Sequence, residues 1–256
     1  MAANKVILQI KDLKKVFPGQ NGDVTAVDGV SFDVYDNEFL VLLGPGQCGK
    51  TVMLNMIAGL EDPTEGEIVL DGEKVSGHDR RIGMVLQKTA LMPWKTVMGN
   101  VEIGPKFRGV AKAERREKAK KFIDLVGLAG FEKAYPAQLS GGMKQRVGIA
   151  RAYTNDPEIL IMDEPFGALD AQTRYAMEEE VAKIWQQQKR TVIFVTNNIE
   201  EACYLGDRII LFSNRPAKIK EIYVNDLPRP RDMISDEFLK LRTAISDNTD
   251  LAIDMV

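Results

Sequence analysis

The amino-acid sequence predicts an α/β fold built around a parallel sheet. Apolar segments of strand length occupy residues 39–43, 159–162 and 191–196, and a helical pattern fills residues 171–188 between the last two. Strands that are apolar throughout are buried on both faces, and a helix between two of them supplies the crossover that parallel pairing requires. A glycine-rich turn follows the first of these strands and leads into another helical pattern. Because 45% of the residues are apolar, we expect the chain to bury a substantial core.

Short strands predominate in the first part of the chain. The elements expected here are, in order, a strand at residues 5–10, two strands within 26–43, a helix at 50–58, a hairpin within 66–75 and a strand at 81–87. Asp71-Gly72 supplies the turn of the hairpin, because this dipeptide favours the tight turns that join antiparallel strands. We therefore expect an antiparallel β part near the N-terminus.

A helical insert interrupts the strands. Residues from about 100 to 126 are rich in Ala, Lys, Arg and Glu, with apolar residues at helical spacing. The stretch from residue 225 has a proline-rich entry and a polar end. We expect one domain, residues 1–256, whose α/β core with its β part comprises 1–87 and 156–224. The expected helical subdomain is 88–155, and 225–256 forms a short C-terminal appendix.

Composition excludes several classes of protein. With 34 basic and 37 acidic residues the net charge is −3, which gives no electrostatic basis for binding nucleic acid. No run approaches the roughly 18 apolar residues of a membrane-spanning helix, and the first residues lack the pattern of a secretory signal. We therefore expect a cytoplasmic protein in which Cys48 and Cys203 are free thiols.

The glycine-rich turn "GPGQCGKT" matches the pattern G-x-x-x-x-G-K-[ST] of a phosphate-binding loop. In such a loop backbone N–H groups surround phosphates, a lysine reaches the terminal phosphates and a hydroxyl binds Mg²⁺. Lys50 and Thr51 hold these two positions, and the turn lies between a strand and a helix, as the motif requires. The residues expected to contact the nucleotide here are Gly44, Pro45, Gly46, Gln47, Cys48, Gly49, Lys50, Thr51 and Val52.

Two adjacent carboxylates, Asp163 and Glu164, follow the apolar residues 159–162. In open α/β sheets ligands bind at the carboxyl ends of strands. We expect Asp163 to hold Mg²⁺ through water and Glu164 to polarise the attacking water. The alternative is a solvated or ion-paired pair of carboxylates.

A second anion-binding position is suggested by "LSGGMKQR", residues 139–146. Ser140 and the glycines Gly141 and Gly142 precede a helical run, and helix N-termini attract phosphates. An ordinary serine N-cap is the alternative.

Taken in order and spacing, five motifs resemble the ATPase subunit of ABC transporters. They are the phosphate loop, "LQ" at 86–87, "LSGGMKQR", "LIMDEP" at 160–165 and "GALD" at 167–170. The resemblance covers nearly the whole chain and implies a P-loop NTPase core of the ABC ATPase type, with Mg²⁺ and ATP as cofactors. It also implies that two copies bind head to tail, so that the Ser140 loop of one closes over ATP on the Lys50 loop of the other.

The resemblance assigns further roles to single residues. Gln87 matches the glutamine that senses the γ-phosphate and the metal, and Asp170 matches the aspartate that contacts the opposite protomer. Phe17 matches the aromatic residue that stacks on adenine; a core or surface aromatic is the alternative. Asn197 stands where the family has a catalytic histidine, and Asn198 follows it.

Partners also follow from the resemblance. Residues 90–97, "ALMPWKTV", match the segment that docks a cytoplasmic helix of the membrane permease. Exposed Met92 and Trp94 would suit this contact, and burial inside the helical lobe is the alternative. The chain looks most like importers of nitrate, sulfonate, taurine and bicarbonate, which are fed by an extracytoplasmic binding protein. We expect a peripheral location on the inner face of the membrane, with a second ATPase subunit in a homodimer or heterodimer.

Three departures from the family pattern predict weaker activity. Gly46-Gln47 replaces the usual Ser-Gly, Val52 replaces a hydroxyl residue, and Asn197 replaces histidine. Each loses a donor or introduces strain worth about 1 kcal/mol or more. Slow ATP hydrolysis is the resulting hypothesis. The alternatives are a degenerate half of a heterodimer, a compensated substitution without kinetic effect, and a soluble ABC ATPase unconnected with transport.

Overall fold

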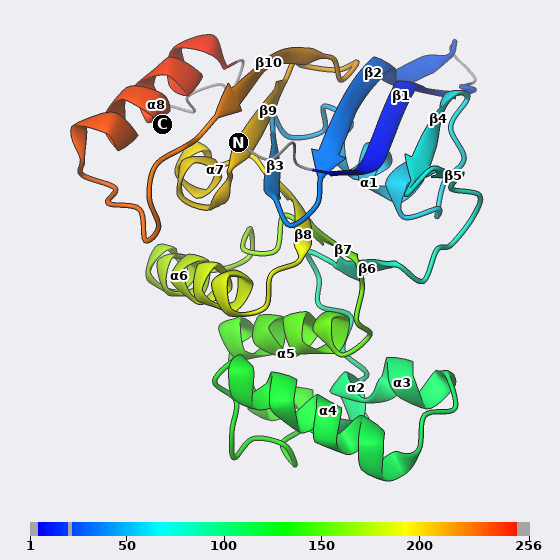
Figure 1. Cartoon of the computed structure of the whole chain (residues 1–256), viewed down its shortest axis with the longest axis vertical. Helices are drawn as coiled ribbons and strands as arrows, with labels where there is room; N and C mark the ends of the chain where they lie inside the picture. Colours follow the sequence, from blue (N-terminus) through cyan, green and yellow to red (C-terminus); the bar gives the residue numbers. More distant parts are fainter. Residues whose placement is uncertain (1–4, 20–21, 250–256) are drawn as a thin grey trace. The chain divides into compact units, whose positions relative to one another are not determined.

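The computed structural model describes residues 5–19 and 22–249, so residues 250–256 of the expected appendix lie outside the described part. The chain divides into two compact units (Figure 1). Unit 1 comprises Met1–Asp79 and Arg190–Val256, and unit 2 comprises Arg80–Lys189. The second unit is therefore an insertion into the first.

Unit 1 contains the expected antiparallel β part. Its strands are β1 (Val6–Phe17), β2 (Val24–Tyr35), β4 (Glu65–Leu70) and β5 (Glu73–Lys74), in the order β2-β1-β4-β5. β1 runs to Phe17, well beyond the alternating residues 5–10, because it pairs along its length with β2 on one side and β4 on the other. Lys11 and Lys14 lie opposite Glu67 and Glu65 of β4 and form ion pairs with them.

A second group of strands in unit 1 carries the buried core. The order is β10-β9-β3-β8, comprising β10 (Ile219–Val224), β9 (Arg208–Phe212), β3 (Phe39–Leu43) and β8 (Thr191–Thr196). β3 is parallel to β8 and to β9, whereas β10 is antiparallel to β9. All residues of β3 and β8 are buried, which confirms the parallel α/β fold expected from the apolar runs.

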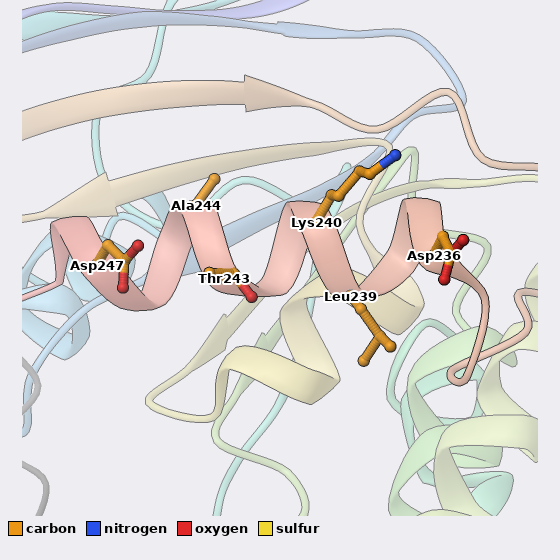
Figure 2. A pocket seen from close by; sticks show the side chains of 6 residues that line it. All are labelled: Asp236, Leu239, Lys240, Thr243, Ala244 and Asp247. Atoms are coloured by element: carbon orange, nitrogen blue, oxygen red, sulfur yellow. The ribbon is translucent and has the colours of Figure 1, made fainter.

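The helices of unit 1 follow these strands. They are α1 (Lys50–Ile57), α7 (Ile199–Leu205) and α8 (Asp236–Asn248). α8 packs on α7, and Phe238 and Ile245 are the buried residues of α8. Figure 2 shows the opposite, exposed face of α8, where a shallow hollow is lined by Asp236, Leu239, Lys240, Thr243, Ala244 and Asp247. Since the predicted nucleotide-binding residues lie elsewhere, this hollow is separate from the candidate site.

Unit 2 combines a parallel strand pair with helices. The strands are β6 (Ile82–Val85) and β7 (Ile159–Asp163). The helices are α2 (Val97–Val101), α3 (Ile103–Phe107), α4 (Lys112–Leu125), the 3₁₀ turn Pro136–Gln138, α5 (Gly141–Tyr153) and α6 (Ala171–Gln187). α4 packs against α5 (Figure 1). The rings of Phe122 on α4 and Tyr153 on α5 are 5.8 Å apart.

The predicted helical insert consists of three helices. α3 is separated from α4 at Gly109, which has a φ of 77°. This left-handed conformation is incompatible with a continuing α-helix and is accessible to glycine without strain. Among residues 5–19 and 22–249, no helix is long and apolar enough to span a membrane.

Candidate nucleotide-binding site

The glycine-rich turn between β3 and α1 is folded around the side chain of Lys50. The Lys50 ammonium donates hydrogen bonds to the carbonyl oxygens of Gly44 and Pro45, each at 2.7 Å, and its Nζ lies 3.8 Å from Cys48 Sγ. Lys50 is only 3% exposed. The loop therefore holds a positive charge at the start of α1, where a helix terminus already favours anions.

The conformation of the loop explains its small residues. Gly49 has a φ of 123°, and a Cβ at this position would collide with the carbonyl oxygen of Ala26. As the N-cap residue of α1, Gly49 has no side chain to accept a hydrogen bond from the first helical turn. A phosphate can satisfy such donors, and the exposed Thr51 places a hydroxyl beside them. These features fit a Mg²⁺-bound nucleotide phosphate.

Gln47 departs from the glycine expected at its position, and its backbone still adopts the left-handed region. Its φ is 61°. The strain expected from this substitution is therefore present, because a residue with a Cβ is destabilised by about 1 kcal/mol or more in this region. Gln47 is exposed, so the cost is in the backbone and the side chain does not crowd the loop.

Strand register in unit 1 places Asn197 beside the phosphate loop. Leu43, the last residue of β3, is the partner of Thr196 on β8 and of Leu211 on β9. Gly44 and Asn197 consequently follow the carboxyl ends of two adjacent parallel strands. Asn197 is exposed at this edge, where ligands of open α/β sheets bind.

Phe17 ends β1 and is 36% exposed. It pairs across the strands with Val24, two residues before the Ala26 that approaches Gly49. The Lys15 ammonium lies 5.1 Å from the Phe17 ring centroid, a distance at which a cation is attracted to an aromatic face. An exposed ring near the strand that supports the loop is suited to stacking on a base.

In unit 2 the predicted metal and catalytic residues follow the paired strands β6 and β7. Val85 is the partner of Met162, so Gln87 and the Asp163-Glu164 pair emerge at the same edge of the strand pair. Asp163 is 8% exposed, whereas Glu164 is partly exposed and has a φ of 41°. A non-glycine residue in this region stores backbone strain, which is concentrated at functional sites.

Gln87 lies close to the loop that follows Glu164. A Cβ added to Gly167 would be 3.3 Å from Gln87 Nε2 and 3.9 Å from the Glu164 Cβ. Gln87 and Glu164 therefore lie close together, although they are about 80 residues apart in sequence. This arrangement would allow both side chains to interact with the same metal ion and water molecule.

The LSGG segment lies against the start of α6. Ser140 is the N-cap of α5, and its Oγ accepts a hydrogen bond from Met143 N at 3.3 Å. A Cβ on Gly142 would be 3.0 Å from Thr173 Cγ2, and one on Gly141 would be 3.5 Å from Leu169 Cδ2. The glycines therefore permit close packing, and the serine cap that was the alternative reading is present.

Asp170 is the N-cap of α6. Its carboxylate accepts hydrogen bonds from Thr173 N at 3.0 Å and from Thr173 Oγ1 at 2.7 Å. These bonds hold the pKa of Asp170 below its ordinary value. Asp170 is accordingly an exposed, ionised carboxylate with a fixed orientation.

The proposed docking segment for a permease also belongs to unit 2. Trp94 is 73% exposed, while Met92 is half-buried and its N–H donates to Asn100 Oδ1 at 2.8 Å. A nearby hollow is lined by residues 87–91 together with Pro136 and Lys144, among others. Trp94 therefore has the exposure that a partner contact requires.

The predicted site residues form one group in each unit. In unit 1 these are the phosphate loop, Phe17 and Asn197; in unit 2 they are Gln87, Asp163, Glu164, Ser140, Gly141, Gly142 and Asp170. The sequence analysis missed two buried residues near Asn197 in the sequence, namely Thr196 and Glu201. The pattern of Asn198 followed three residues later by Glu201 resembles a capping box and was an available signal.

Taken together, a buried parallel sheet and a glycine loop folded around a lysine at a helix start define a P-loop nucleotide-binding protein. Three comparisons identify the family. The family model described as "ABC transporter" matches residues 27–167. An ABC transporter ATP-binding protein of Methanocaldococcus jannaschii is 54% identical over 241 residues, which cover 94% of this chain and 90% of the relative.

A second relative is the aliphatic sulfonates import ATP-binding protein of Bacillus cereus. It is 41% identical over 240 residues, which cover 93% of this chain and 94% of the relative. Among solved structures, a bacterial ABC transporter cassette in dimeric form superposes with a TM-score of 0.75 at 32% identity, covering 88% of this chain and 100% of the cassette. The same cassette is also known in a post-hydrolysis state bound to ADP and Pi. The chain belongs to the ABC transporter family, as an ATP-binding subunit.

Proposed function

We propose that this chain binds and hydrolyses ATP to power a membrane importer of a small anion, such as nitrate, sulfonate, taurine or bicarbonate. The observation that carries the proposal is the complete phosphate loop around buried Lys50. The 41% identity to a sulfonate import protein over nearly the whole chain favours this group of substrates. As a peripheral subunit on the inner face of the membrane, the chain works with permease subunits and, indirectly, an extracytoplasmic binding protein.

The residues divide the work on the nucleotide. Backbone N–H groups of the loop residues 44–52, Pro45 excepted, bind the phosphates. Lys50 binds the terminal pair, and Phe17 stacks on adenine. Thr51, Gln87 and Asp163 would hold Mg²⁺, with Asp163 acting through water. When bound, this ion neutralises phosphate charge during the displacement.

Catalysis then depends on two residues at strand ends. Glu164 accepts a hydrogen bond from the attacking water and orients it towards the γ-phosphate. Asn197 donates a hydrogen bond to the γ-phosphate in place of the family's histidine. Since the amide is short and carries no charge, its contribution to the transition state is smaller than that of a cation.

Dimer closure couples this chemistry to transport. Ser140, Gly141 and Gly142 of one protomer bind the phosphates held by the partner, and Asp170 contacts the opposite protomer. Residues 90–97, with exposed Trp94, dock the permease. We also propose that 88–155 acts as the helical subdomain that carries the Ser140 loop and the docking segment 90–97, and that 225–256 forms a C-terminal appendix.

Replacing the loop lysine tests the proposal. Lys50→Ala removes the ammonium that binds the terminal phosphates, so calorimetry should detect no Mg-ATP binding. The exposed lysine on α8 provides a matched control, and Lys240→Ala should bind ATP as wild type does. Unchanged ATP affinity in Lys50→Ala would overturn the assignment. Co-purification with permease subunits distinguishes a transporter subunit from a soluble ABC ATPase.

A second candidate is the degenerate half of a heterodimer, which is favoured by the neutral Asn197 at the strand end beside the loop. Hydrogen bonds to charged groups are worth about 1.5–3 kcal/mol, so a weaker bond here slows turnover by roughly 10- to 150-fold. Asn197→His should raise ATP turnover of the isolated homodimer at least severalfold. An unchanged rate, with wild type already turning over at roughly 1 per second or faster, would contradict slow hydrolysis.

A further inference from the structure

A buried carboxylate lies in the first turn of α7, four residues after Asn197. Glu201 is 3% exposed, and burying a carboxylate is costly unless it is hydrogen-bonded. Its Oε2 accepts a hydrogen bond from Thr196 Oγ1 at 2.6 Å. This is the length of a strong, charge-assisted O–H···O⁻ bond. The start of a helix also favours a negative charge, so the local structure accommodates the carboxylate in one defined position.

Thr196 connects the Glu201 carboxylate to Asn198, the residue that follows Asn197. Its hydroxyl donates to Glu201 and accepts a hydrogen bond from Asn198 N at 3.0 Å. Asn198 Oδ1 in turn accepts from Glu200 N at 2.8 Å and from Glu201 N at 3.2 Å. Residues 196–201 are therefore closed into a ring of hydrogen bonds. Asn197 lies between two anchored neighbours and is exposed.

The ring is fixed relative to the phosphate loop. Thr196 is 2% exposed and pairs with Leu43, the residue before Gly44. The Thr196 hydroxyl donates to Glu201 and accepts from Asn198 at the same time, and these two bonds together favour one orientation of the side chain at the end of β8. The direction in which Asn197 leaves the sheet is thus set by Thr196 and Glu201.

The far end of α7 is also held. Three side chains that follow β10 donate to its last three carbonyls: Asn225 Nδ2 to Cys203 at 2.8 Å, Arg231 Nη1 to Tyr204 at 2.8 Å and Arg229 Nη2 to Leu205 at 2.5 Å. Because both ends of α7 are anchored, Glu201 cannot shift along the helix axis without breaking these bonds. The carboxylate is a fixed support for Thr196.

We propose that Thr196 and Glu201 are positioning residues that hold Asn197 towards the nucleotide phosphates beside Gly44. This inference rests on the proposed function, since it assumes that Asn197 contacts the γ-phosphate. The asparagine side chain is shorter than that of histidine. Asn197 can therefore contact a phosphate only if its backbone is held in the right place. The hydrogen-bonded ring supplies that placement.

The hydroxyl of Thr196 can be removed without changing the shape of the side chain. Thr196→Val is isosteric, and Thr196→Ser keeps the hydroxyl. We expect Thr196→Val to lower kcat for ATP at least fivefold with less than a twofold change in KM. Thr196→Ser should stay within twofold of wild type in both constants, and ADP affinity should be the same in all three proteins.

Glu201 provides a second, independent pair of variants. Glu201→Gln keeps an oxygen that accepts the Thr196 hydroxyl, so kcat should stay within about threefold of wild type. Glu201→Ala removes the acceptor and should reproduce the effect of Thr196→Val. Circular dichroism and thermal unfolding show whether each variant folds. If Thr196→Val does not fold, Glu201→Ala is compared with wild type in its place, and the reverse holds if Glu201→Ala does not fold.

Binding without hydrolysis separates this inference from the proposed function. Wild type should bind a non-hydrolysable ATP analogue more tightly than ADP. In Thr196→Val the ratio of analogue affinity to ADP affinity should be at most half of the wild-type ratio. A wild-type protein that binds no ATP would overturn the proposed function itself. A wild type that binds and hydrolyses ATP, with Thr196→Val unchanged in kcat and in the analogue-to-ADP ratio, would overturn only the positioning role. A parallel loss of ADP affinity would also overturn it, since that indicates general damage to the loop.

Discussion

At Gln47 the backbone conformation and the side-chain type disagree. Its φ of 61° belongs to the region that glycine enters freely, yet it carries a Cβ. Gln47 lies in the turn between β3 and α1 and adopts this conformation there, so the backbone carries the strain. The sequence indicated the substitution, and the strand and helix on either side of the loop enforce the geometry.

Gln47→Gly should therefore stabilise the protein. Relief of the left-handed strain is worth about 1 kcal/mol and exceeds the entropy that an added glycine gives the unfolded chain. Chemical denaturation should show a free energy of unfolding that is higher by a few tenths of a kcal/mol or more. ATP affinity should be retained or increased.

Gln188 offers a matched control for this change. It ends α6 with a φ of −128°, which other residues adopt without strain. Gln188→Gly should lower the free energy of unfolding by roughly 0.5–1 kcal/mol, as glycine does where its freedom is not needed. If both variants lower stability equally, the strain assigned to Gln47 does not exist.

At the scale of elements, Ser140 at the start of α5 has two roles. Ser140 caps the helix by accepting from Met143 N, and we propose that it also binds the partner's nucleotide. Asp and Asn are N-cap residues of similar quality to Ser, so they preserve the first role. They differ in charge, which adds a small favourable interaction of Asp with the helix dipole and acts mainly on the second role.

Ser140→Asp should leave stability close to wild type and prevent ATP-dependent dimerisation, because a carboxylate repels the γ-phosphate. Ser140→Asn should have the same stability and retain dimerisation, weakened by less than tenfold. Light scattering with ATP, using the Lys50→Ala protein as a non-binding reference, measures the dimer. Equal dimerisation of the Asp and Asn variants would indicate that Ser140 is only a cap.

At the scale of the whole molecule, the reactivity of the two cysteines measures how tightly the chain is packed around them. Cys48 and Cys203 are both buried free thiols. Burial raises the pKa of Cys203 from its ordinary value of 9.0 to about 12. At pH 8 its thiolate fraction thus falls from about one in ten to about one in ten thousand. Reaction with a thiol reagent then requires the protein to open.

We expect Cys203, studied alone in a Cys48→Ala background, to react with Ellman's reagent at pH 8 at least about a thousandfold more slowly than in denaturant. The same shift affects stability. Below pH 9 both states keep the proton, and between about pH 9 and 12 the unfolded thiol ionises first, so stability is lost as the pH rises.

Between pH 8 and 10 this loss is worth about 1 kcal/mol. The free energy of unfolding should therefore fall more steeply for Cys48→Ala than for the Cys48→Ala/Cys203→Ala variant. Rapid labelling of the native protein at pH 8 would show that Cys203 is accessible to solvent. The same conclusion would follow if the free energy of unfolding fell equally steeply with pH in the two variants.

Most elements could be predicted because their signals are local. The strand at 191–196 and the helix from Ala171 match the structure to within a residue, since apolar runs, periodicity and the Asp170 cap lie in the segments themselves. The phosphate loop was likewise recognisable from eight consecutive residues. The length of β1 was not, because it depends on pairing with β2 and β4.

By itself the sequence determined the class of protein, the nucleotide loop and the identity of the residues that depart from the family pattern. Only the tertiary structure decided which of them are neighbours. The pairing of Leu43 with Thr196 joins strands about 150 residues apart and brings Asn197 beside Gly44. The burial of Glu201, and the anchoring of α7 by residues 225–231, depend in the same way on segments that meet only in the folded chain. Local patterns record propensity and periodicity, whereas pairing and burial are properties of the packed sheet as a whole.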